Sequence, residues 1–123
     1  MIMRWKNFFK RSWTVPIVRL DGVIGSSGQF GGGGLTDSSL ASVLEKAFEM
    51  PRIKAVAIVI NSPGGSPTQS SLIAGRIRRL AIENKVEVIA FCEDVAASGG
   101  YWLACAADEI YADENSIIGS IGV

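Results

Sequence analysis

The residues of this chain best suited to covalent chemistry lie in the stretch VAASGG, residues 95–100. Ser98 stands where an apolar, strand-like run gives way to a helix-like run, and two glycines follow it. A serine at such a point either caps the helix through its side chain or acts as a nucleophile on a sharp strand-to-helix turn. Local signals favour the cap, so the nucleophile hypothesis depends on features elsewhere in the chain.

A second glycine-bearing turn, NSPGGS, covers residues 61–66 and follows another apolar run. In parallel α/β sheets, sites lie beyond the carboxyl ends of the strands, so neighbouring strands would bring this turn to Ser98. Acyl transfer through a serine needs backbone N–H groups aimed at the developing oxyanion, and glycine leaves the backbone accessible. We therefore predict Gly99 as one donor, and Gly65, or alternatively Gly64, as the other.

The base that would activate Ser98 is not evident, because the chain contains no histidine. Lys6 and Lys10 fall in the N-terminal tail, Lys46 falls on a predicted helix, and Lys54 and Lys85 precede predicted strands. A lysine base must be desolvated to lower its pKa toward neutrality, and none of the five is so placed. We therefore predict that the general base lies outside this chain segment.

The elements that must position the two turns alternate between strand and helix patterns. Apolar, β-branched runs predict strands over 14–25, 54–61, 86–93 and 108–113, with another beginning at 116. Amphipathic spacing predicts helices over 36–50, 67–85 and 98–107. This order predicts an α/β domain with a mostly parallel sheet and right-handed crossovers.

Composition indicates one globular domain with an uneven charge distribution. The 123 residues are 48% apolar and 20% charged, which excludes a disordered chain. Basic and acidic residues balance at twelve each, but residues 1–13 hold four bases and no acid. Nothing in this pattern points to nucleic acid, and we expect no nucleic-acid partner.

The N-terminal tail allows two interpretations. Ile2, Trp5, Phe9 and Trp13 share one face of a helix with basic residues around them, as in a helix lying on an anionic membrane. The alternative is an unstructured start. No apolar run approaches the roughly 18 residues of a membrane-spanning helix, so we expect no transmembrane segment in this chain.

Other features give fewer constraints. Cys92 and Cys105 lack metal-ligand spacing and sit in apolar stretches, so we expect two buried free thiols, no metal and no cofactor. The glycine-rich stretch at 25–34 is either a solvent loop or a flap beside a site.

Two longer stretches closely resemble the signal peptide peptidase A, or protease IV, family of serine peptidases. They are VINSPGGSPTQSSLIAGRIRRL and VIAFCEDVAASGGYWLACAADEIYADENSIIGSIGV, and the resemblance extends over residues 15–123. It implies the Clp/crotonase-like α/β fold of repeated ββα units with a mostly parallel sheet. We expect residues 15–123 to be the N-terminal part of such a domain, incomplete at its C-terminus, after a basic aromatic tail of residues 1–14.

The resemblance also implies roles for particular residues. Ser98 matches the nucleophile of a serine–lysine dyad, and Gly99 and a glycine of the SPGG turn match the oxyanion donors. Ser120 matches the serine that orients the lysine, although on local signals alone it is an ordinary turn serine. Family members are usually bacterial, form homo-oligomeric rings and degrade signal-peptide remnants or other hydrophobic peptides. We expect a cytoplasmic location or one peripheral to the inner membrane.

Two alternatives remain at this stage. An acyl-CoA enzyme on the crotonase fold would use the same N–H pair to hold a thioester enolate, with carboxylates at the site. Glu93 and Asp94 are near in sequence but precede the turn. A catalytically incomplete ring subunit is the other alternative.

Overall fold

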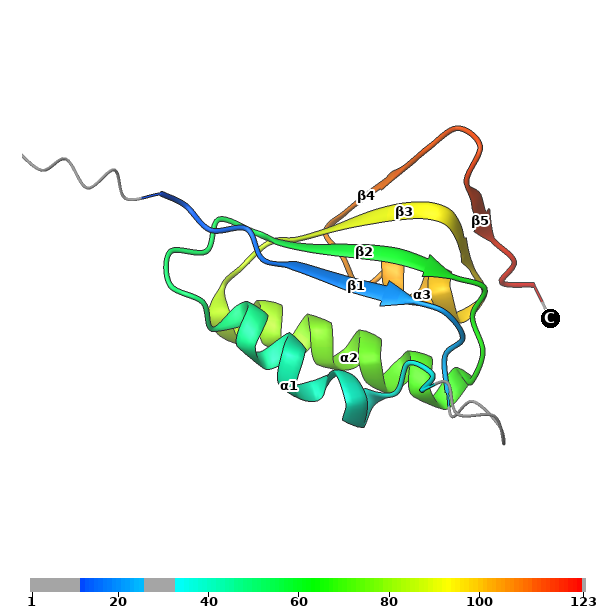
Figure 1. Cartoon of the computed structure of the whole chain (residues 1–123), viewed down its shortest axis with the longest axis horizontal. Coiled ribbons are helices and arrows are strands. Elements are labelled where there is room, and N and C mark those ends of the chain that lie inside the picture. Colours follow the sequence, from blue (N-terminus) through cyan, green and yellow to red (C-terminus); the bar gives the residue numbers. More distant parts are fainter. Residues whose placement is uncertain (1–11, 26–32, 123) are drawn as a thin grey trace, which may run out of the picture.

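The computed structural model describes residues 12–25 and 33–122. The membrane hypothesis for residues 1–13 and the flap hypothesis for residues 25–34 therefore fall largely outside the described residues. The elements are β1 (Ile17–Asp21), α1 (Asp37–Phe48), β2 (Val56–Ser62), α2 (Pro67–Asn84), β3 (Val88–Ala97), α3 (Gly99–Ala104), β4 (Glu109–Ala112) and β5 (Ile117–Gly119). Figure 1 shows them in chain order.

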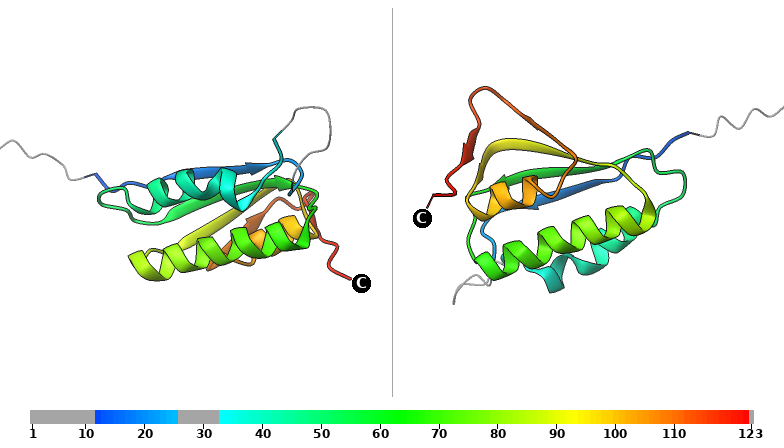
Figure 2. Two further views of the ribbon diagram at one scale, coloured as in Figure 1. Left: turned by 90° about the horizontal axis from the view of Figure 1, so that it is seen from below. Right: turned by 180° about the vertical axis from the view of Figure 1, so that it is seen from behind.

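One parallel sheet organises the molecule. Its strands lie in the order β1-β2-β3-β4, β5 pairs with β3, and every pairing is parallel. Consecutive strands are neighbours, so right-handed crossovers place α1, α2 and α3 on the same face of the sheet (Figures 1 and 2). The predicted α/β fold with a parallel sheet is confirmed.

The hydrophobic core fills the layer between the sheet and these helices. β1 alternates exposed and buried residues, whereas most of the central strand β2 is buried. The largest fully buried side chains come from both layers: Leu20, Ile58 and Ile60 from strands, and Leu44, Phe48, Ile73 and Ile77 from helices. Within the described ranges, no helix combines the length and apolar character that crossing a bilayer requires.

A kink in β3 aims its carboxyl end toward the first residue of α3. The register between β2 and β3 shifts after the Ile60–Cys92 pair, and the next pair is Ser62 with Ala96. Asn61 of β2 lies opposite this bulge in β3: its Oδ1 accepts the Val95 N–H at 3.2 Å, and its Nδ2 donates to Asp94 at 3.0 Å. Bulges bend a strand and change the direction of the residues beyond them. Past this bulge, β3 exchanges β4 for β5 as its neighbour on that side.

Substitution of Asn61 by alanine is expected to lower the free energy of unfolding by about 1–2 kcal/mol. The Val95 N–H is part-buried and donates to Asn61 Oδ1, and an alanine side chain would offer it no acceptor. Urea unfolding followed by circular dichroism measures the change. Asn115→Ala, in the exposed turn before β5, is the control and should cost less. Equal losses in both variants would contradict a role for Asn61 in holding the bulge.

An ion pair joins the middle of α2 to α1. Arg76 on α2 donates to both carboxylate oxygens of Asp37 on α1, at 2.7 and 2.9 Å, and to Glu45 at 3.0 Å. Thr36 caps α1 and accepts from Ser39 N–H. The hydrogen bond from Arg76 holds the pKa of Asp37 below its ordinary value of 3.8. The carboxylate therefore stays ionised in the folded state at lower pH than in the unfolded chain.

The Arg76–Asp37 pair is expected to contribute its full share of the free energy of unfolding at pH values above the ordinary carboxyl pKa of 3.8. This contribution should disappear as the pH falls through the lower pKa that Asp37 has in the folded state. Asp37→Asn should cost about 1–2 kcal/mol near neutral pH, and the difference from wild type should narrow in acid. Denaturant unfolding across the pH range measures this. Glu83→Gln, which removes an exposed pair with Arg79 on α2, should change stability by less than about 0.5 kcal/mol. A pH-independent cost for Asp37→Asn would refute the expectation.

Candidate active site

Ser98 links the end of β3 to the start of α3 in a conformation that side chains seldom adopt. Its φ is 53° and its ψ is −121°, and its side chain makes no capping hydrogen bond. Capping of the helix by the Ser98 side chain, favoured by local signals, is therefore wrong. Its backbone N–H donates to the carbonyl of Gly119 at 2.6 Å. Strained conformations of this kind cluster at functional sites, where surrounding structure holds them in place.

The two glycines after Ser98 are required by close packing. A Cβ at Gly99 would collide with the hydroxyl of the fully buried Ser70 on α2. A Cβ at Gly100 would lie 2.5 Å from the carbonyl oxygen of Ser62, at the end of β2. The start of α3 therefore sits directly against α2 and β2, and only glycine fits there.

The NSPGGS turn touches the same point, as the sequence predicted. A Cβ at Gly64 would lie 2.8 Å from both the Gly99 nitrogen and the Ser98 Cβ. The N–H of Gly64 already donates to Ser62 Oγ at 3.1 Å. Gly65 has a φ of 150°, and no hydrogen bond within the described residues uses its N–H or that of Gly99. Between the two candidate donors of this turn, the geometry favours Gly65 over Gly64.

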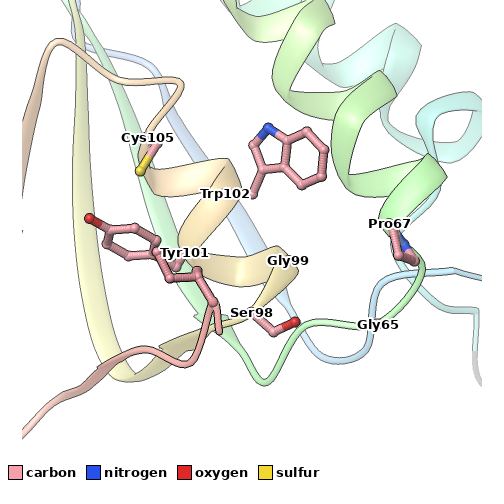
Figure 3. Close-up of a pocket in the computed structure, with 8 residues that line it drawn as sticks. Gly65, Pro67, Ser98, Gly99, Tyr101, Trp102 and Cys105 are labelled. Carbon is pink, nitrogen blue, oxygen red and sulfur yellow. The ribbon is translucent and has the colours of Figure 1, made fainter. Parts of the chain in front are cut away.

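A pocket of about 300 Å³ opens beside Ser98 (Figure 3). Ser98, Tyr101, Trp102 and Cys105 of its wall follow the helical spacing i, i+3, i+4 and i+7 along and just beyond α3. The other lining residues are Gly65, Pro67, Gly99 and Ile121. Sequence reasoning did not identify Tyr101, Trp102 or Cys105 as pocket residues, although their spacing from Ser98 carried that signal.

Strand β5 brings the last predicted site residue, Ser120, to the same edge of the sheet. The register pairs Val95 with Ile117 and Ala97 with Gly119, whose carbonyl accepts the Ser98 N–H. Ser120 follows directly with a φ of 57° and an exposed side chain. All five predicted site residues therefore meet at one end of the molecule, and their roles in catalysis stay predictions.

Comparison with known proteins gives this geometry a family. The model of peptidase family S49 matches residues 81–123. Protease 4 of Haemophilus influenzae is 40% identical over 111 residues, covering 89% of this chain and 17% of that protein. A putative signal peptide peptidase, SppA, of Enterococcus faecium is 32% identical over 112 residues, covering 87% of this chain and 32% of that protein. The chain belongs to peptidase family S49.

Two further matches refine this assignment. A Brucella abortus protein named Na(+)/H(+) antiporter NhaA is 56% identical over 109 residues, but the match covers only 15% of it. That name describes a much longer protein and does not define this S49 segment. A mutant of the membrane-bound stomatin-specific protease 1510-N aligns with a TM-score of 0.64 at 20% identity, over 85% of this chain and 45% of that one. It supports the shared α/β fold.

The three lysines described in this S49 chain lie away from Ser98. Lys54 precedes β2 and Lys85 caps the C-terminus of α2, both at the end of the sheet opposite the NSPGGS turn. The seven residues of β2 span roughly 20 Å between those ends. Lys46 lies in the last turn of α1 and borders a different surface pocket. Among the described residues that line the Ser98 pocket, none is lysine, aspartate or glutamate.

The carboxylates near Ser98 in sequence point elsewhere. Glu93 accepts from Arg19 at 2.6 Å, and Asp94 accepts from Asn61. Neither lines the Ser98 pocket, so neither is placed to act as the carboxylate that the acyl-CoA alternative needs there. Within the described ranges, no group of three potential metal ligands is gathered in one place.

The two thiols of the S49 chain differ in their surroundings. Cys92 is buried, and burial raises the pKa of its thiol. Cys105 is exposed, so the expectation that both thiols are buried is wrong for Cys105. It lies one helical turn beyond Tyr101 on the pocket side of the chain. Hydrogen bonding with Cys105 raises the pKa of the Tyr101 phenol above its ordinary value of 10, at which the phenol is already uncharged at neutral pH.

Proposed function

We propose that this chain supplies the nucleophile and the oxyanion hole of a serine endopeptidase of the signal peptide peptidase A type. The observation that carries the proposal is the position of Ser98. Its hydroxyl is free of a capping bond and lies beside a pocket into which the Gly65 and Gly99 turns both open. Ser98 Oγ would attack a peptide carbonyl, the N–H groups of Gly65 and Gly99 would hold the oxyanion, and the amine would leave with the serine proton. Water would then release the acyl group.

The general base of this mechanism is proposed to be a lysine outside this chain segment, oriented by Ser120. The lining of the pocket supports this, since it contains no described lysine. In isolation the chain would then be catalytically incomplete, as in the ring-subunit alternative. The matched relatives are several times longer than the segment they share with this chain. The parts of the enzyme beyond this segment are therefore proposed by analogy with these relatives.

The substrates are proposed to be signal-peptide remnants or other hydrophobic peptides, because the pocket wall is formed by apolar and aromatic side chains. By analogy with the family, we propose a homo-oligomeric ring in a bacterial cytoplasm or at the inner membrane surface. Contact with the membrane would be made by residues 1–13. Flotation with anionic vesicles should be lost when these residues are deleted, and equal flotation of both forms would reject this part.

The nucleophile is tested by treating the full chain with a p-nitrophenyl ester of N-acetyl-leucine and mapping the adduct by mass spectrometry. Ser98 Oγ should displace p-nitrophenolate, and the adduct should be absent from Ser98→Ala. Its rate of formation should exceed that of the urea-unfolded chain by about 100-fold, from the oxyanion donors alone. Ser116→Ala is the matched control. Equal labelling of several serines, or none on Ser98, would overturn the proposal.

A further inference from the structure

The Ser98 pocket is one end of a longer groove between α2 and α3. A second cavity of about 320 Å³ adjoins it and is lined in part by Ser71, Ala74, Gly75 and Arg78 of α2. With Pro67 of the first pocket, these residues form a continuous stripe along α2. The facing wall is the stripe that starts at Ser98 and runs along α3.

Trp102 separates the two cavities. It lines both of them, as does Cys105. Figure 3 shows its indole ring extending from α3 toward α2, above Ser98. On the α2 side the opposing residues are small: Ala74 is buried, and a Cβ built on Gly75 would meet nothing within 4 Å. The indole is therefore the bulkiest group across the groove at this point.

The far end of the groove offers no uncompensated charge. Arg78 donates to the carbonyl of Ala106 at 3.1 Å and to the carboxylate of Asp108 at 3.2 Å. A charged group entering the groove would lose hydration without gaining a free partner, which disfavours it. The groove therefore suits uncharged, apolar side chains along its whole length.

We propose that Trp102 is a specificity-determining residue that limits the size of the side chain accepted next to the scissile bond on its acyl side. The proposal rests on the function proposed above. The side chain next to a carbonyl held by Gly65 and Gly99 is attached to the adjoining Cα, and the first pocket borders both glycines. With the indole in place, the cavity open to that side chain measures about 300 Å³. Without it, the second cavity joins the first, and the preference shifts toward large aromatic side chains.

The test compares p-nitrophenyl esters of N-acetyl-leucine and N-acetyl-2-naphthylalanine on the full chain, with acylation of Ser98 measured by mass spectrometry. In Trp102→Ala the naphthyl-to-leucyl rate ratio should rise about tenfold or more over wild type. The ratio for Trp102→Leu should lie between those of wild type and Trp102→Ala. Trp102→Leu replaces Trp102→Ala in the test if the alanine variant folds poorly. Trp13→Ala is the matched control and should leave the ratio unchanged, because Trp13 is an exposed tryptophan that precedes β1.

Refilling the second cavity supplies an internal check. In the Trp102→Ala background, Gly75→Leu directs a side chain into the space that the second cavity provides. The naphthyl-to-leucyl ratio should return toward the wild-type value. A ratio that stays raised would show that the acyl side chain does not use the second cavity, and the proposal would fail.

A second readout does not depend on peptidase chemistry. Cys105 borders both cavities and Cys92 is buried, so N-methyl- and N-(naphthylmethyl)maleimide report access to the groove through thiol addition. The naphthyl-to-methyl ratio should rise in Trp102→Ala, and labelling should vanish in Cys105→Ser. If the maleimide ratio rises in Trp102→Ala but no ester acylates Ser98, the proposed function fails. The conclusion that Trp102 separates the two cavities then still stands. If the ester ratio or the maleimide ratio is unchanged in a chain that reacts, the proposal on Trp102 is overturned.

Discussion

Replacement of Gly65 by alanine is expected to slow acylation of Ser98 by about 100-fold or more. The φ of 150° at Gly65 strains any residue with a side chain, and the added methyl group would collide with the carbonyl oxygen of Ile24. That carbonyl already accepts from Ser66 at 2.8 Å, and the Ile24 N–H donates to Gly64 at 2.9 Å. The turn must therefore shift as a unit, and the Gly65 N–H shifts with it away from the oxyanion position.

The same substitution should also lower stability by about 1–3 kcal/mol, because the strain is not relieved in the folded state. The rate must be compared under conditions where circular dichroism shows both proteins folded. Gly75→Ala is the control, since its new methyl group meets nothing within 4 Å and lies in the interior of α2. That variant should gain up to about 1 kcal/mol and keep the wild-type rate. A Gly65→Ala protein with the wild-type rate would remove Gly65 from the oxyanion hole.

The alternation of elements was predictable because each strand and helix carries its own periodicity. The register of the sheet was not, because β3 changes partner partway along its length. The sequence predicts a strand ending at residue 93, whereas β3 continues to Ala97. Its last residues are held by β5 and by the Asn61 side chain, which come from distant parts of the chain. No local pattern in residues 94–97 reports those contacts.

The site shows the same division between local and tertiary information. Glycine-bearing turns after two buried strands indicated that Ser98 and the NSPGGS turn would lie together, although local signals alone favoured a helix cap at Ser98. The choice between Gly64 and Gly65 was left open, because it depends on the Ser62 hydroxyl accepting the Gly64 N–H. The spacing of Trp102 from Ser98 was readable from the sequence. Its position between two cavities was not, because α2 supplies the opposite wall.

The rate of Ser98 acylation by an activated ester is expected to rise with pH, with a slope near one and no plateau, from about pH 7 to about pH 9. A serine with an adjacent base reaches a plateau once that base is deprotonated. In the described part of this chain, the pocket around Ser98 contains no lysine, aspartate or glutamate. Hydroxide in solution then takes the serine proton. A positioned base contributes about 100- to 10,000-fold, so its absence is a large effect at neutral pH.

Initial acylation rates across this pH range, with the adduct on Ser98 counted by mass spectrometry, give the profile. The matched control is the triple variant Lys46→Ala, Lys54→Ala, Lys85→Ala, which should reproduce the wild-type profile because these residues lie away from the pocket. The Tyr101 phenol is the titratable group in the pocket wall besides Cys105, and its raised pKa keeps it protonated over most of this range. A sigmoidal profile with a midpoint near neutrality would show a base within the chain itself. Loss of that sigmoid in a lysine variant would then identify the residue and refute the proposal that the base is supplied from elsewhere.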